Sequence, residues 1–241
     1  MIVRCLRLSL HNVDGLITAL VLPIMLMLMF VYLFGGALST GGKYVDYVVP
    51  GVLLVCAGFG AATTAVTVSH DLTTGIVDRF RSMDVGAGAL ITGQVVASVA
   101  RNLISTALVF AVAFAIGFRS PAGVLAWLGV VGVLALFILA LSWLSAAIGI
   151  AARSPEAASG ITFLISFLPY LSSAFVPIRT MPSWLQGFAR HQPLNPVIDT
   201  VRALLTGGPV AASAGTAVAW SLAIIVASAA LAAFLFNRRT G

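Results

Sequence analysis

The chain has 241 residues, of which 60% are hydrophobic and only 8% charged, and its mean hydropathy is +1.09. Its 7 acidic and 13 basic residues cannot cover a globule of this length with polar side chains, so a water-soluble domain is excluded and the bilayer is the expected solvent. The net charge of +6 is scattered between apolar runs, which favours membrane orientation and lipid headgroups over nucleic acid as its explanation.

Apolar segments long enough to cross a bilayer recur along the chain. Before the first of them, residues 1–14 place apolar side chains at helical spacing beside Arg4, Arg7 and His11. This pattern predicts an interfacial helix with its arginines towards phosphates, with a plain anchor for the start of the chain as the alternative role. The predicted spans are residues 16–38, 48–69, 95–118, 124–150, 157–176 and 215–236.

Six spans predict an all-α integral membrane protein with one membrane domain, residues 1–241. The first span is longer than the apolar part of a cleaved signal peptide. Arg101 interrupts the third span and is expected to snorkel to the headgroups. With the termini inside, 8 arginines lie in cytoplasmic regions and 5 basic residues in outer regions, which favours cytoplasmic termini. Lys43 is the only lysine, a bias that indicates a GC-rich bacterial genome and hence the bacterial plasma membrane.

A dense polar segment, HDLTTGIVDRFRSMDVGAG, lies in the predicted cytoplasmic loop of residues 70–94. Apolar and charged side chains interleave there at helical spacing, which predicts a short amphipathic helix. The residues concerned are Ile76, Val77, Phe80 and Met83 with Asp78, Arg79 and Arg81. A docking surface for a cytoplasmic partner explains both halves of this pattern, whereas a solvated connector would not need Phe80 and Met83.

The outer loop, residues 178–214, is too apolar to be a free loop. Trp184 and Phe188 form one amphipathic turn set, and a second short helix is predicted to follow a break at Pro193 and Pro196. The second helix would carry Ile198, Val201 and Leu205 on its apolar face. These features predict a helical hairpin dipping into the outer leaflet, with Trp184 as an interfacial anchor in the simplest interpretation.

The predicted spans contain no acid and no histidine, so proton coupling lacks its usual residues. The sequence has no phosphate-binding loop and no hydrolase or zinc-protease motif, so no cofactor is expected in this chain. Ser154 and Pro155 before Glu156 predict a capped helix start. Ser142, Ser145 and Gly149 predict close helix packing.

Four separated stretches resemble type-two ABC exporter permeases of the daunorubicin-type drug-resistance and lipid-export branch. They are LVLPIMLMLMFVYLFGGAL, YVDYVVPGVLL, GIVDRFRSMDV and FVPIRTMPSWLQGFARHQPLNPVIDTVRAL. The resemblance implies a six-span half-transporter that pairs with a second permease copy or a paralogue and binds two ATPase subunits, which would hold ATP and magnesium. It implies export of a hydrophobic drug or lipid. The alternatives to this function are an ion-coupled carrier and a lipid-handling enzyme.

The same resemblance identifies the loop between spans two and three as the coupling helix that the ATPase receives. The family pattern falls here on Gly75, Asp78, Arg79, Arg81, Ser82 and Met83. Asp84 stands where relatives usually have proline, and HNVD replaces a common basic–asparagine–proline run near the N-terminus. The resemblance also implies that the hairpin, with Trp184, Phe188, Pro193, Asn195, Pro196 and Arg202, is an outer gate. A static lid that only helps the spans pack is the alternative.

Overall fold

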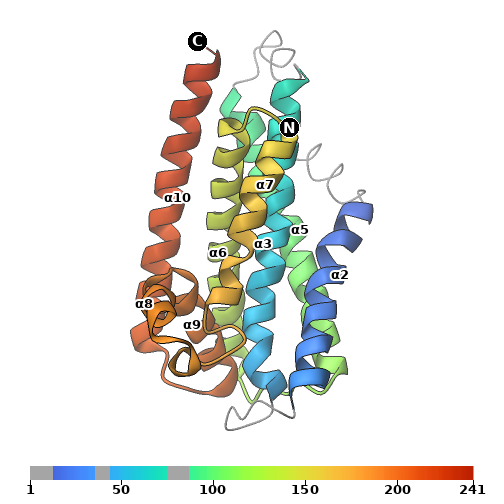
Figure 1. The fold of residues 1–241 in the computed structure, drawn as a ribbon, viewed down its shortest axis with the longest axis vertical. Coiled ribbons are helices and arrows are strands. Elements are labelled where there is room, and N and C mark those ends of the chain that lie inside the picture. Colours follow the sequence, from blue (N-terminus) through green and yellow to red (C-terminus); the bar gives the residue numbers. More distant parts are fainter. Residues whose placement is uncertain (1–12, 36–43, 75–86, 241) are drawn as a thin grey trace.

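The computed structural model describes residues 13–35, 44–74 and 87–240, and every regular element in these ranges is a helix (Figure 1). In chain order the elements are α2 (Val13–Met29), a π-helical turn (Phe30–Phe34), α3 (Tyr44–Thr73), α5 (Ala87–Ala115), α6 (Val124–Ala151), α7 (Pro155–Ser166), two 3₁₀ turns (Leu168–Leu171 and Ile178–Thr180), α8 (Ser183–His191), α9 (Leu194–Thr206) and α10 (Ala211–Thr240). The long helices run side by side, and α8 and α9 lie at one end of the bundle.

Among the described residues, α3, α5, α6 and α10 are long and apolar enough to cross a membrane. Each has 28 to 30 residues, or about 42–45 Å at 1.5 Å per residue, which exceeds the roughly 30 Å hydrocarbon core. Large apolar side chains are exposed on the outer helices, for example Leu125, Val226 and Phe234. Lipid would cover these side chains, so the chain is a multi-pass membrane protein.

Helix α3 lies at the centre of the bundle and contacts α2, α5, α6, α7 and α9. Within it, Val48, Val49 and all residues from Val52 to Ala57 are completely buried. Its side chains are apolar and small, and a helix satisfies every backbone hydrogen bond within the segment, which hydrocarbon requires. The four helices named above correspond to the predicted spans 48–69, 95–118, 124–150 and 215–236, whereas the first predicted span forms the shorter α2 and its π-helical turn.

The predicted fifth span, residues 157–176, is not one continuous helix. Helix α7 ends at Ser166, and a 3₁₀ turn that contains Pro169 follows it. Proline lacks a backbone donor and clashes with the preceding turn, so the helix cannot continue through it. The prediction of one uninterrupted helix was wrong here, because hydropathy counts Pro169 and its neighbours as an apolar run without registering the break.

Helix α3 also extends beyond the predicted span at both ends. Asp46 lies in its first turn, and His70 and Asp71 lie in its last turns. These ionisable residues therefore belong to a spanning helix, although they occupy its ends and not its centre. The start of α7 agrees with the prediction, because the Ser154 hydroxyl accepts a hydrogen bond from the Ala157 amide and Pro155 is the first helical residue.

Small residues allow α6 to approach α3 closely, as the sequence predicted. Ser142 and Ser145 are buried, and a Cβ added at Gly149 would lie 2.5 Å from the Ala65 carbonyl oxygen. That contact is shorter than any real Cβ contact, and its partner is backbone that cannot rotate away.

Gly149→Ala is therefore expected to push α6 from α3 and to lower the unfolding free energy by about 1–3 kcal/mol. The measurement is the melting temperature of the detergent-purified chain. Gly160→Ala on α7 is the control, because a Cβ there meets nothing within 4 Å. Equal melting temperatures for the two variants would contradict the close contact.

Candidate functional site

Two of the three predicted sets of functional residues lie outside the described residues. These are the interfacial set, Arg4, Arg7 and His11, and the coupling set, Gly75, Val77, Asp78, Arg79, Phe80, Arg81, Ser82 and Met83. Both sets stay predictions. The third set, the outer hairpin, is described completely and forms the candidate site.

The first arm of the hairpin, α8, turns its aromatic side chains outward. Trp184 is 77% exposed and Phe188 is 51% exposed, whereas Ala189 is completely buried. Lipid, headgroups or another protein surface can cover these rings. The interfacial position of α8 stays a prediction.

The second arm, α9, faces the other way. Ile198, Val201 and Leu205 are buried in the main hydrophobic core, which also contains residues of α3 and α6. The prediction that these side chains dip into the outer leaflet is therefore wrong. An apolar stripe at helical spacing shows that a helix has a buried face, but it does not show whether lipid or protein buries that face.

The break between the two arms is formed by Gln192 and Pro193, between the end of α8 and the start of α9. Pro196 was predicted to belong to this break, but it lies inside the first turn of α9. The first four amides of a helix have no partner within it, so a proline at this position costs the helix no hydrogen bond.

Asn195 ties the break to the chain that follows α7. Its Oδ1 accepts a hydrogen bond from the Ser173 amide at 2.8 Å, and its Nδ2 donates to the Ala189 carbonyl oxygen of α8. Gln192 adds a second tie, donating from Nε2 to the Leu171 carbonyl oxygen at 2.7 Å. Both side chains are buried, so each bond is shielded from competing water.

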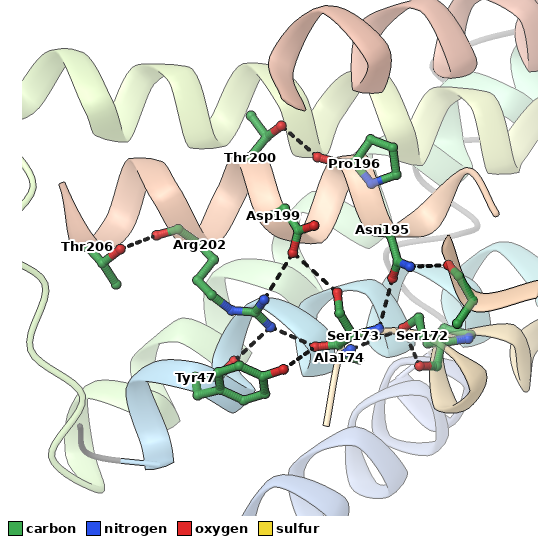
Figure 2. A network of polar contacts seen from close by, with 12 residues as sticks. Tyr47, Ser172, Ser173, Ala174, Asn195, Pro196, Asp199, Thr200, Arg202 and Thr206 are labelled. Atoms are coloured by element: carbon green, nitrogen blue, oxygen red, sulfur yellow. Dashed lines mark hydrogen bonds and ion pairs between the residues drawn. The ribbon is translucent and has the colours of Figure 1, made fainter. Parts of the chain in front are cut away.

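Arg202 occupies the centre of a polar network between α9, α3 and residues 172–174 (Figure 2). Its guanidinium lies 4.0 Å from the centre of the Tyr47 ring, a cation–π contact. It donates to the carbonyl oxygens of Ser173 at 2.8 Å and Tyr47 at 3.3 Å. It also forms an ion pair with Asp199 at 3.1 Å, and Asp199 in turn accepts a hydrogen bond from the Ser173 hydroxyl.

The charge of Asp199 depends on these neighbours. Burial raises the pKa of the Asp199 carboxyl, and Arg202 and the Ser173 hydroxyl offset this shift only in part. Ionised Asp199 therefore relies on Arg202 for its stabilisation, so the two residues act as one unit.

Arg101, expected at the headgroups, points into the protein instead. It lies at the midpoint of α5, with 14 residues between it and either end of the helix. Its guanidinium donates to Thr63 at 2.6 Å, to Thr64 at 3.3 Å and to the Gly60 carbonyl oxygen at 3.2 Å, all on α3. An arginine at the centre of a membrane helix costs about 2.5–3.5 kcal/mol, and these bonds replace part of its lost hydration.

The sequence prediction missed most of the side chains that hold the hairpin. Tyr47, Ser173 and Gln192 were not singled out, and Asp199 was assigned no role. One signal was present, since Asp199 and Arg202 are three residues apart and such a pair can meet on a helix surface.

Most of the chain is similar in sequence to known proteins. Residues 1–206 match the ABC-2 type transporter family. The chain is 31% identical over 199 residues to the daunorubicin resistance ABC transporter permease protein DrrB1 of Streptomyces coeruleorubidus, covering 82% of this chain and 70% of that protein. It is 23% identical over 224 residues to the probable doxorubicin resistance ABC transporter permease protein DrrC of Mycobacterium tuberculosis, covering 92% and 81% of the two chains.

Proposed function

Because this chain belongs to the ABC-2 type transporter family, we propose that it is the membrane-spanning permease subunit of an ATP-driven exporter for a hydrophobic drug or lipid. The match over residues 1–206 carries this proposal. The names of the two relatives support a drug as the substrate class. The apolar helices support passage of an amphipathic compound through a membrane.

The energy would come from two ABC ATPase subunits that hold ATP and magnesium. The coupling set, residues 75–83, would be the surface that these subunits contact. A second copy of this chain or a paralogous permease would complete the transmembrane part, and bilayer lipids would surround it.

The test is reconstitution of the permease with its ATPase in lipid vesicles. We expect ATP-dependent accumulation of daunorubicin, and none when the ATPase lacks its catalytic residues. Uptake driven by an ion gradient with this chain alone would instead support a secondary carrier.

We propose six membrane crossings in the bacterial plasma membrane, with both termini in the cytoplasm. Support comes from the course of the chain, since α2 runs towards the end of the bundle that holds the hairpin and α10 runs away from that end (Figure 1). Helix α7 and the irregular segment after it would together make the fifth crossing, and α2 with its π-helical turn would make the first.

Cysteines introduced at Ser183 and Ser82 test this orientation, in a chain from which Cys5 and Cys56 have been removed. A membrane-impermeant thiol reagent should label Ser183→Cys in intact cells and Ser82→Cys only after the cells are opened. Labelling of both in intact cells would exclude the six-crossing arrangement.

The outer hairpin would act as a gate that changes its arrangement during the transport cycle. Trp184 is the most exposed residue of its aromatic face, so it is the side chain best placed to meet the substrate or the second permease copy. Trp184→Ala is expected to lower ATP-driven export several-fold while expression and ATPase assembly are retained.

Trp220→Ala on α10 is the matched control, because Trp220 is also exposed but lies outside the hairpin. Normal export by Trp184→Ala, or an equal loss in both variants, would favour a static lid over a gate.

A further inference from the structure

Helices α3 and α5 are joined by a row of polar contacts along their shared face. Gln94, Ser98 and Arg101 follow one another at intervals of four and three residues, so they lie on one side of α5. Gln94 donates to the Asp71 carboxylate at 2.9 Å, and Ser98 accepts from the Thr64 hydroxyl at 2.7 Å. Arg101 donates to the Thr63 hydroxyl at 2.6 Å. We name these three links the polar seam.

The polar seam is closed most tightly at its inner end. A Cβ added at Gly60 would lie 1.7 Å from Oδ1 of Asn102, so the Asn102 side chain packs directly onto the glycine and would have to move for a larger residue. Asn102 and Ser98 are completely buried. The Ser98 hydroxyl also lies 2.9 Å from the Ser142 hydroxyl, which extends the row to α6.

Sliding one helix along the other would break all three links at once. The Thr64–Ser98 contact is buried, so its separated hydroxyls would find no water as a replacement partner. Arg101 contributes most to this resistance, because its single guanidinium contacts three acceptors within one turn of α3. The seam therefore favours joint movement of α3 and α5 over movement of one against the other.

The polar seam lies between two parts of the permease with proposed roles in transport. Helix α3 ends at Thr73 and α5 begins at Ala87, so the joined pair enters and leaves the segment that carries the proposed coupling set. The far end of α3 carries Tyr47, which contacts Arg202 of the hairpin. A rigid α3–α5 pair would therefore connect the proposed ATPase contact with the opposite end of the bundle.

We propose that Arg101 is a positioning residue for transport, fastening α3 to α5 so that the pair moves as one lever when ATP drives the ATPase subunits. This proposal rests on the proposed function, and it adds the part of the permease that carries the movement. It predicts that a covalent link across the seam is compatible with transport.

The first test is the double variant Thr64→Cys/Ser98→Cys in a permease without Cys5 and Cys56. The native hydroxyl oxygens are 2.7 Å apart, so two sulfurs at these positions are within reach of a disulfide. The oxidised complex, assembled with its ATPase in vesicles, should transport daunorubicin within about twofold of its reduced form. Loss of transport on oxidation, restored by reduction, would show that the helices must slide and would overturn the proposal.

The second test is Arg101→Ala, with Arg101→Lys as the conservative variant. We expect Arg101→Ala to reduce the drug transported per ATP hydrolysed by roughly tenfold while ATP hydrolysis continues, with an intermediate value for Arg101→Lys. Arg119→Ala is the control and should match the parent, because the Arg119 guanidinium donates to the carbonyl oxygens of Phe114 and Phe118, close to it in the chain. The Thr64–Ser98 disulfide should restore coupling to Arg101→Ala.

The role assigned to Arg101 would be overturned if Arg101→Ala transported as much drug per ATP hydrolysed as the parent. It would also be overturned if the disulfide failed to restore this ratio. If Arg101→Ala does not assemble, Arg101→Lys with and without the disulfide gives the same comparison. Absence of ATP-driven transport in the parent complex would contradict the proposed function itself. Failure of only the seam variants would contradict only the lever.

Discussion

Arg202→Ala is expected to lower the unfolding free energy by about 2–4 kcal/mol and to abolish most ATP-driven export. The substitution removes an ion pair, two hydrogen bonds to carbonyl oxygens and a cation–π contact. Hydrogen bonds to charged groups contribute about 1.5–3 kcal/mol each, and water at this end of the bundle would replace part of that sum. The part of the free energy that water does not replace is lost from the contact between α9, α3 and the segment after α7.

The melting temperature of the detergent-purified chain measures this effect, with an expected decrease of roughly 5–15 °C. Arg190→Ala is the matched control, because Arg190 is exposed and makes one long hydrogen bond, to Gln186. Adding Asp199→Asn to Arg202→Ala should recover part of the loss, since it removes a carboxylate that no longer has its cation. A melting temperature within about 2 °C of the parent would contradict the role given to Arg202.

Phe80→Ala is expected to weaken ATPase association by tenfold or more while membrane insertion stays intact. Apolar anchors dominate contact energies at interfaces, and truncating one costs about 1–3 kcal/mol. A loss of 1.4 kcal/mol corresponds to a tenfold weaker affinity. The affinity of the purified permease for its ATPase gives the measurement.

Phe234→Ala provides the control for this prediction, because it makes the same change at an exposed position of α10, outside the coupling set. If Phe80→Ala binds the ATPase as tightly as the parent and transports normally, residues 75–83 are a solvated connector. The coupling helix would then have to be sought elsewhere.

The long helices could be predicted from the sequence because hydrocarbon leaves the backbone few alternatives. A run of about 20 apolar residues in a membrane forms a helix whatever its neighbours are, so α3, α5, α6 and α10 were recognisable individually. The capped start of α7 was recognisable for a similar reason, since Ser154 and Pro155 act on the backbone within one turn. Both signals are local.

The errors concern contacts between distant parts of the chain. Hydropathy treated residues 157–176 as one span because it records how apolar a residue is and not that Pro169 ends a helix. The apolar face of α9 was predicted to contact lipid, although α3 and α6 cover it. The prediction that Arg101 reaches the headgroups was wrong for a related reason. Its partners Thr63 and Thr64 are 38 and 37 residues away in the sequence, and only the fold brings them close.

Most of the hydrogen bonds that other helices make to the segment after α7 go to its main chain, while Ala174 and Phe175 pack in the core. Tyr44 and Tyr47 donate to the carbonyl oxygens of Phe175 and Ser173, and Gln192, Asn195 and Arg202 bind the main chain of residues 171–173. Main-chain atoms are the same for nearly every amino acid, so most substitutions in this segment would keep the bonds. Changes in the five side chains that hold it would remove them. A saturation mutagenesis screen should therefore find Leu171, which is 40% exposed, more tolerant than Ser172, Ala174 and Phe175, whose buried side chains must also fit the core. The five side chains that hold the segment should be intolerant positions.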